Sequence, residues 1–158
     1  MESAAPGYAV RLAGGAALPT RRIVLATGLR DGLPDIPGVR ERWGKDVVFC
    51  PYCHGYEVRD QPIAVLGTHP GAMGHAQLLR QWSADIVCFP HTLELSDADR
   101  GRLDARGIRI AEGTIRQLVV DDDRLSGVEL ADGTTVPRAA AFLIAQMAPF
   151  DAAVESRR

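Results

Sequence analysis

The chain has 158 residues, of which 46% are apolar and 24% charged, the balance of an ordinary globular domain with a hydrophobic core. Its net charge of −2 gives no electrostatic reason to expect nucleic-acid binding. No apolar run approaches the roughly 20 residues that span a bilayer, so we expect no membrane partner.

The first 44 residues predict two strands, a connector and a short helix. Residues 8–12 alternate in polarity, and residues 22–26 form an apolar run typical of a short buried strand. The segment 31–38 holds two glycines and two prolines, a density of breakers that predicts a connector or crossover between domains. Residues 39–44 follow as a short helix.

From residue 63 onward the pattern becomes β-α-β. The apolar runs 63–66 and 86–89 are typical of strands buried on both faces, and residues 72–82 between them predict a helix. Ser96 can cap a second helix, which we expect to end near residue 105.

The remaining sequence predicts short strands. Residues 108–110 form one of them, and residues 115–120, 125–130 and 134–137 predict a meander with acidic and glycine-containing turns. Residues 141–145 are a last apolar strand. Strands that alternate with helices and end in a meander indicate the α/β class.

The segment Cys50-Pro51-Tyr52-Cys53-His54 carries the strongest chemical signal. Two thiols at this spacing can close a disulfide within one tight turn. At the start of a helix, backbone N–H groups and the positive helix end favour the thiolate, which is the reactive form. His54 can carry the protons that dithiol chemistry moves. The pair is therefore a candidate two-electron redox centre.

Two other interpretations of the cysteine pair are a zinc site and a structural disulfide. Zinc takes four ligands, but the only other cysteine is Cys88 and the histidines stand at no familiar spacing, so we expect no metal. A structural disulfide suits an oxidising compartment. Because no cleavable apolar leader opens the sequence, we expect a cytoplasmic protein, where a disulfide is more often catalytic.

The loop after the strand 63–66 has the layout of a dinucleotide site. In the spacing Gly-x-Gly-x-x-Gly/Ala, Gly67 and Ala72 fill the first and third places, and a pyrophosphate would rest on the helix N-terminus. His69 fills the second place, where only glycine allows close approach of the pyrophosphate. An ordinary turn between a strand and a helix is the alternative interpretation.

The order of these parts resembles the middle of the thioredoxin reductase-like flavoproteins, over about residues 8 to 150. An Ala-Thr-Gly that closes a strand, a Pro/Gly connector, Cys-x-x-Cys and strand-glycine-helix follow one another as in that family. The segment Cys-Pro-Tyr-Cys-His-Gly-Tyr-Glu looks like a bacterial and fungal subgroup that includes dithiol oxidases of secondary metabolites.

The resemblance implies an α/β fold in which a Rossmann-like, three-layer nucleotide-binding domain with a β-meander is flanked by fragments of an FAD domain. Residues 1–38 would be an FAD-domain remnant with the crossover. Residues 39–138 would be the NAD(P)-binding-like domain that carries the cysteine motif, and residues 139–158 would begin the return to the FAD domain.

The resemblance also implies residue roles. Cys50 would exchange with the substrate, Cys53 would face the flavin, and His54 would replace the family's acidic proton donor and acceptor. The implied contacts with FAD and the nicotinamide nucleotide are Ala26, Thr27, Gly28, Gly67, Thr68, His69 and Ala72.

The sequence departs from the family in three places. The N-terminal FAD fingerprint and the C-terminal Gly-Asp segment are absent, so we expect FAD binding by this chain alone to be weak or absent. Pro90-His91-Thr92-Leu93 stands where the family carries arginines for the NADP 2′-phosphate, and together with His69 it predicts poor NADPH binding. We expect a truncated product, a fragment or one part of a split enzyme.

The implied function is thiol-disulfide oxidoreduction at Cys50 and Cys53, coupled to FAD and to NADPH or oxygen. Its partners would be a small dithiol or disulfide substrate or a thioredoxin-like protein, and a second copy or a complementing FAD-domain chain. A non-catalytic nucleotide-binding or interaction domain and a flavin-independent thiol-disulfide protein are the alternatives.

Overall fold

The computed structural model describes residues 7–150, and the chain divides into two compact units. Unit 1 comprises Met1–Arg30 and Ala148–Arg158, and unit 2 comprises Asp31–Met147. Unit 2 contains both the cysteine pair and the glycine loop. None of the helices within residues 7–150 has the length and apolarity that crossing a bilayer requires.

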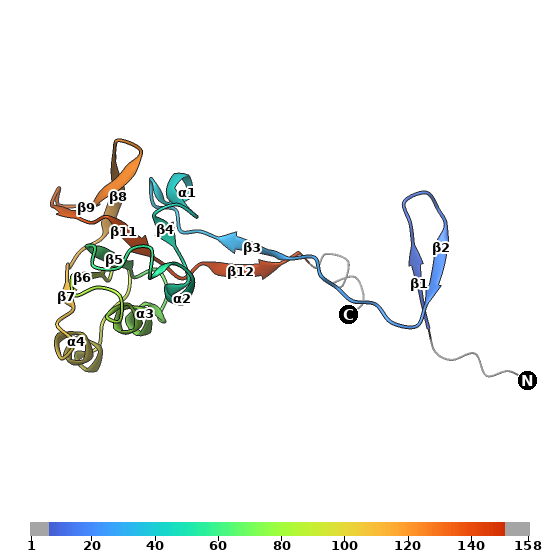
Figure 1. Cartoon of the computed structure of the whole chain (residues 1–158), viewed down its shortest axis with the longest axis horizontal. Helices are drawn as coiled ribbons and strands as arrows, with labels where there is room; N and C mark the ends of the chain where they lie inside the picture. The colour runs from blue at the N-terminus through green and yellow to red at the C-terminus, as the bar shows by residue number, and fades with distance from the viewer. Residues whose placement is uncertain (1–6, 151–158) are drawn as a thin grey trace, which may run out of the picture. The chain divides into compact units, whose positions relative to one another are not determined.

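The centre of unit 2 is a five-stranded parallel sheet (Figure 1). In spatial order its strands are β4 (Val47–Val48), β11 (Ala140–Phe142), β5 (Ile63–Leu66), β6 (Ile86–Phe89) and β7 (Arg109–Ile110). Every residue of β5 and β6 is buried, as the two continuous apolar runs predict, and both strands have the predicted bounds.

Helices cover one face of this sheet (Figure 1). They are α3 (Ala72–Leu79) and α4 (Asp97–Asp104), and the short helices α1 (Val39–Arg42) and α2 (Pro51–His54) precede them in the chain. Ser96 caps α4 by accepting a hydrogen bond from the N–H of Asp99 at 3.1 Å, as predicted. The predicted helix 72–82 ends three residues early, because Gln81 and Trp82 donate to carbonyls three residues back and tighten the last turn.

The predicted meander covers the opposite face. It consists of β8 (Ile115–Asp121), β9 (Arg124–Leu130) and β10 (Thr135–Pro137), which pair antiparallel in the order β10-β9-β8. Asp122 and Asp123 have φ values of 47° and 54° and form the two-residue turn between β8 and β9.

Two hydrophobic clusters, one on each side of the sheet, make the unit three-layered. Successive residues of β5 point to opposite faces. Ala64 and Leu66 join the cluster under the meander, whereas Ile63 and Val65 join the cluster under α3 and α4. The expected Rossmann-like α/β architecture with a meander is therefore confirmed.

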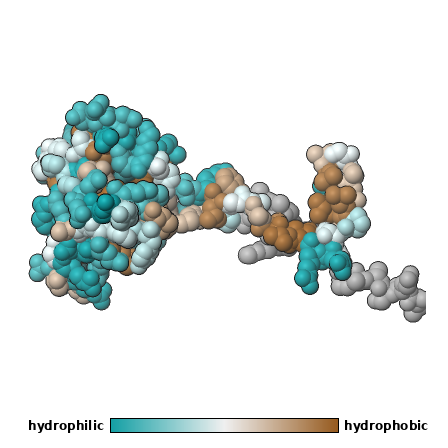
Figure 2. All heavy atoms as spheres, in the orientation of Figure 1, coloured by the Kyte–Doolittle hydropathy of each residue, from teal (hydrophilic) through white to brown (hydrophobic). Residues whose placement is uncertain are grey.

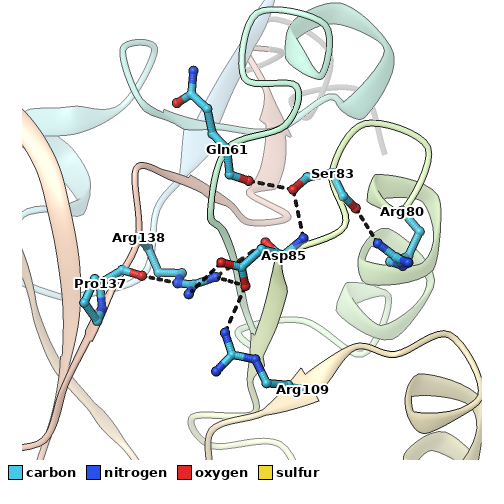
Figure 3. A network of polar contacts seen from close by, with 7 residues as sticks. All are labelled: Gln61, Arg80, Ser83, Asp85, Arg109, Pro137 and Arg138. Atoms are coloured by element: carbon cyan, nitrogen blue, oxygen red, sulfur yellow. Dashed lines mark hydrogen bonds and ion pairs between the residues drawn. The ribbon is translucent and has the colours of Figure 1, made fainter.

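A polar network fixes the amino-terminal edge of the sheet (Figure 3). The Asp85 carboxylate precedes β6 and accepts hydrogen bonds from Arg138 at 2.8 Å and from Arg109 at 2.9 Å. The Arg138 side chain, which lies just before β11, is only 5% exposed. The hydrogen bond from Arg138 lowers the pKa of Asp85. The network thus ties the beginnings of β6, β7 and β11 together.

Unit 1 contains the hairpin of β1 (Tyr8–Arg11) and β2 (Ala17–Thr20), which pair antiparallel. The strand predicted at residues 8–12 is confirmed. The strand predicted at residues 22–26 is wrong, because a buried strand needs neighbours and no described segment pairs with these residues; Val24 is 88% exposed.

A second two-stranded ladder joins β3 (Leu29–Gly32) and β12 (Gln146–Pro149), and the boundary between the units crosses both strands. The strand predicted at residues 141–145 is β11, which starts and ends earlier at Ala140–Phe142. It stops there because its neighbour β4 ends at Val48, so the sheet offers no further partner on that side.

Candidate dithiol site and glycine loop

The cysteine pair occupies the start of α2. Cys50 is the N-cap residue, with extended backbone angles, and its sulfur accepts a hydrogen bond from the N–H of Cys53 at 3.3 Å. Pro51 fits the first helical position, where its missing N–H would have had no partner. The backbone thus places the motif at a helix start, which is the setting that favours a thiolate.

The two thiols differ in charge and exposure. Both cysteines are free, and the Cys53 thiol donates to the Cys50 sulfur across 2.8 Å. This hydrogen bond lowers the pKa of Cys50, with help from the backbone N–H groups of Cys53 and Tyr52. The same bond raises the pKa of Cys53. Half-buried Cys50 is thus the thiol that loses its proton more readily, and exposed Cys53 is the one that keeps it.

His54 ends α2 beside the thiols, and its Nδ1 lies 3.3 Å from a carboxylate oxygen of Glu57. The turn between them is tightly packed. A Cβ on Gly55 would lie 2.3 Å from the Pro51 carbonyl oxygen and 2.4 Å from the Trp82 ring, so glycine is required there. The sequence interpretation missed Glu57, although its spacing of three residues from His54 could have indicated the contact.

Two exposed tyrosines of the cysteine segment were also missed. Tyr52 lies between the two cysteines and is 65% exposed, and Tyr56 follows His54 by two residues and is 61% exposed. The Tyr56 ring meets Trp82 edge-on at 6.3 Å, and the Arg59 guanidinium stacks over it at 4.0 Å. Apolar surface is therefore available next to the reactive sulfurs.

The glycine loop lies on the same unit, and α2 packs against α3, the helix that follows this loop. Gly67 donates its N–H to the Phe89 carbonyl at 2.7 Å, and a Cβ there would lie 2.4 Å from the Pro90 carbonyl oxygen. The close packing between β5 and the end of β6 thus explains why residue 67 is a glycine, and this explanation needs no ligand. Ala72 is buried as the first residue of α3.

His69 fills the position where a pyrophosphate would rest. Its Nδ1 accepts a hydrogen bond from the N–H of Gly71 at 3.0 Å, and Gly71 is the N-cap residue of α3. A dinucleotide at such a loop needs free N–H groups at the helix start. The residues present therefore fit NADPH poorly.

Thr68 lines a small cavity of about 220 Å³ beside the loop, together with Leu33, Pro34 and Ile144. Its hydroxyl oxygen is buried and has no hydrogen-bond partner among the described residues. The cavity is far smaller than a dinucleotide needs. It therefore provides no other place for the dinucleotide whose pyrophosphate position His69 occupies.

Ala26, Thr27 and Gly28 belong to unit 1, whereas the cysteine pair and the glycine loop belong to unit 2. All three are exposed and lie outside any strand. Gly28 has a φ of 76°, and its carbonyl accepts the N–H of Phe150 at 3.2 Å. FAD needs a pyrophosphate cradle at a helix N-terminus, and the described part of unit 1 contains strands and no helix. These residues alone do not fit tight FAD binding.

The third cysteine is remote from this chemistry. Cys88 is buried in β6, its sulfur lies 3.8 Å from that of Met73, and burial raises its pKa to about 12. Within residues 7–150 no three His, Cys, Asp or Glu side chains group closely enough to hold a metal ion.

Comparisons with known proteins place the chain in context. No family model matches it. It is 39% identical over 85 residues to a probable thioredoxin reductase of Arthroderma benhamiae, which covers 54% of this chain and 21% of that protein. The crystal structure of HlmI is 62% identical, with a TM-score of 0.89, over 96% of this chain and 48% of that one.

A putative thioredoxin reductase, TrxB from Bacillus anthracis, is 29% identical with a TM-score of 0.81, over 92% of this chain and 49% of that one. The chain thus spans about half the length of these two solved proteins, and less of the curated relative.

Proposed function

Because the chain is thioredoxin reductase-like over about half the length of its solved relatives, we propose that it carries the exchange centre of a flavin-linked thiol-disulfide oxidoreductase. Cys50 and Cys53 are the redox pair and His54 moves protons. The nucleotide-binding-like domain, expected at residues 39–138, then also includes β11 (Ala140–Phe142), which lies between β4 and β5 in its sheet. The segments before and after it belong to the FAD domain.

The observation that carries this proposal is the hydrogen bond from the Cys53 thiol to the Cys50 sulfur at 2.8 Å. It lowers the pKa of Cys50 and so favours Cys50 as the group that attacks or is attacked in exchange. A buried pair of structural cysteines would need no such asymmetry, and Cys53 is exposed.

The proposed exchange moves two electrons and two protons from the two thiols of the substrate to the disulfide of Cys50 and Cys53. A substrate thiolate attacks the Cys50 sulfur of the oxidised pair, the Cys50–Cys53 bond breaks, and Cys53 leaves as a thiolate that takes up a proton. The second substrate thiol then attacks the mixed disulfide and releases Cys50. The substrate dithiol loses two electrons and two protons, and the cysteine pair gains them. FAD, when bound in a complete flavoprotein, accepts this electron pair.

The direction we favour is oxidation of a small dithiol rather than NADPH-driven reduction of a thioredoxin-like protein. His69 supports this choice because it occupies the N–H group of Gly71 that a pyrophosphate would use. Exposed Tyr52 and Tyr56 offer apolar surface to a small substrate beside the sulfurs. A thioredoxin-like partner remains the second candidate for the same site.

The matched variants Cys53→Ser and Cys50→Ser test the assignment of Cys50. Serine at position 53 keeps a hydroxyl donor toward Cys50, so this variant should form a mixed disulfide with oxidised glutathione rapidly at pH 7. Cys50→Ser should react on the order of tenfold more slowly, since the backbone N–H groups that favour a thiolate point to the sulfur of residue 50 and not to that of Cys53. Mass spectrometry counts the adducts, and buried Cys88 serves as the unreactive internal control.

Equal rates in the two variants would contradict the assignment of Cys50. No adduct in either variant would favour the alternative, a non-catalytic interaction domain. We further expect the purified chain to be colourless, since the described residues offer FAD no pyrophosphate cradle.

A further inference from the structure

We propose that Glu57 is a positioning residue for His54: its carboxylate holds the imidazole with the proton on Nδ1 and leaves Nε2 free to exchange a proton with the sulfurs. The contact is the 3.3 Å distance between His54 Nδ1 and a Glu57 carboxylate oxygen. The inference rests on the proposed dithiol exchange and deepens it, because it states how His54 is prepared for proton transfer.

Elementary hydrogen-bond chemistry fixes the tautomer. An ionised carboxylate can only accept hydrogen bonds, so Nδ1 of His54 must be the donor in this contact. In a neutral imidazole the other nitrogen, Nε2, then carries a free lone pair. A base with its lone pair on Nε2 is what a neighbouring thiol needs as it gives up its proton.

The backbone prepares the contact before any substrate arrives. The N–H of Glu57 donates to the carbonyl of His54 at 3.1 Å, which closes a turn around Gly55. That turn cannot shift easily, because Gly55 lies against Trp82 with no room for a side chain. Two side chains three residues apart on a fixed turn are thereby held on the same side.

Stability is a poor explanation for this pair. The side chains of His54 and Glu57 are 40% and 69% exposed, and ion pairs of this exposure contribute on the order of 0–1 kcal/mol to folding. Replacing Glu57 should therefore leave the fold unchanged but change the tautomer of the His54 imidazole. The experiment measures that change.

The proton step balances as follows. The S–H bond of a thiol breaks, the sulfur keeps the electron pair as a thiolate, and a new N–H bond forms at Nε2 of His54. The resulting imidazolium lies against the Glu57 carboxylate, which offsets its charge. The reverse transfer returns the proton to the thiolate that leaves when the disulfide breaks.

Several other ionisable groups lie near His54 in the chain or on the helix packed against α2. On the same segment they are Cys50, Cys53, Tyr56, Arg59 and Asp60. The Arg59 guanidinium stacks on Tyr56 and donates to its carbonyl at 2.9 Å. From α3, the helix packed against α2, His75 contacts the Phe49 ring at 5.5 Å. Glu57 makes no other ion pair within residues 7–150.

The tautomer is measured by nitrogen-15 NMR of the reduced full chain labelled on histidine, with His54→Ala to assign the signals. We expect His54 in the unmodified protein to carry its proton on Nδ1. Glu57→Ala should return it to the Nε2–H form that free histidine prefers, and Glu57→Gln, which keeps an acceptor oxygen, should largely preserve the Nδ1–H form. An Nε2–H tautomer in the unmodified protein, or no change in Glu57→Ala, overturns the proposal.

A double-mutant cycle tests whether Glu57 acts on the thiols through His54. The pH profile of thiol alkylation should shift in Glu57→Ala by about half a pH unit, toward the profile of His54→Ala. In the His54→Ala background the same change should have no effect. Asp60→Asn removes a nearby charge without touching His54 and should leave the profile unchanged.

An equal shift in both backgrounds would show a direct charge effect on the sulfurs and would overturn the positioning role. A failure of the proposed function looks different: Cys50 would react no faster than Cys53, while the dependence of the His54 tautomer on Glu57 would persist.

Discussion

In the candidate site, two side chains accept hydrogen bonds from backbone N–H groups of their own segment. The Cys50 sulfur accepts the N–H of Cys53, and His69 accepts the N–H of Gly71. Each contact uses an N–H at the start of a helix, where the regular partner carbonyl four residues back in the helix is missing. The first contact helps to lower the pKa of Cys50, and the second occupies an N–H that a phosphate would use.

Replacing His69 tests whether its contact with Gly71 prevents NADPH binding. His69→Gly frees the N–H of Gly71 and restores the glycine that a pyrophosphate approach needs, so NADPH should bind about tenfold more tightly, a gain of about 1.4 kcal/mol. Isothermal titration calorimetry measures the affinity.

The matched control for this change is His69→Asn, whose side-chain oxygen can still accept an N–H two residues on. It should bind NADPH as weakly as the unmodified chain. Tight NADPH binding by the unmodified chain would show that His69 does not block the loop.

At the scale of elements, the carboxyl-terminal and amino-terminal edges of the parallel sheet differ in what they carry. The carboxyl-terminal edge of β5 carries the glycine loop, and the amino-terminal edge is closed by the network of Asp85, Arg109 and Arg138 (Figure 3). The pKa of Asp85 is lowered by its arginines, so its contribution to stability is present above the pKa of an unfolded aspartate. That contribution is lost as the pH falls through the lower pKa of the folded state.

Neutralising Asp85 should destabilise unit 2. In Asp85→Asn the Arg138 guanidinium, 5% exposed, loses its counter-charge, and we expect a loss of about 1–3 kcal/mol in the free energy of unfolding. Arg109→Met removes the partner whose side chain is 64% exposed and should cost less than about 1 kcal/mol. Urea unfolding at pH 7 measures both, and equal losses would contradict the burial argument.

His91 joins the end of β6 to the start of β8. Its Nδ1 accepts the N–H of Ile115 at 3.0 Å, and burial lowers its pKa. A protonated imidazole cannot accept this bond, so stability should fall as the pH drops below about 6.5, the unfolded value, toward the lower folded pKa.

The matching variant is His91→Asn, because asparagine tolerates the φ of 58° at this position. Between pH 8 and pH 5.5, the free energy of unfolding should fall less in this variant than in the unmodified chain. The pKa of His75 is also lowered by burial, so a remaining decline is expected. An identical pH dependence in the variant would show that His91 does not contribute.

At the scale of the whole molecule, the two units differ in how they treat apolar side chains. Unit 2 buries its strands on both faces, whereas the hairpin of unit 1 exposes Tyr8, Val10 and Leu18 (Figure 2). Val10 and Leu18 are paired across the hairpin and so share one face. Exposed apolar strands of this kind mark contact surfaces with another chain.

We therefore expect the chain to self-associate through the hairpin unless a complementing FAD-domain chain covers it. Leu18→Lys should shift the population toward monomer in analytical ultracentrifugation. Ala17→Lys places the same charge on the neighbouring residue of β2, which points to the opposite face, and should leave the association unchanged. A monomeric unmodified chain, or equal effects of both variants, would contradict this surface.

The sequence by itself determined those features that depend on residues close together in the chain. The buried runs of β5 and β6, the Ser96 cap and the acidic turn of the meander follow from local patterns. Each needs only the periodicity of side chains or the chemistry of a helix end. The order of the parts along the chain is also readable from the sequence, and that order carries the resemblance to the thioredoxin reductase-like family.

Only the tertiary structure decided which groups meet across the fold. Residues 22–26 look like a buried strand, but a strand needs partners, and the described chain provides none for them. The pairing of Asp85 with Arg138 joins residues far apart in sequence, and the packing of Gly55 under Trp82 fixes the turn that brings Glu57 to His54. Such contacts depend on how distant segments pack, which a local pattern does not encode.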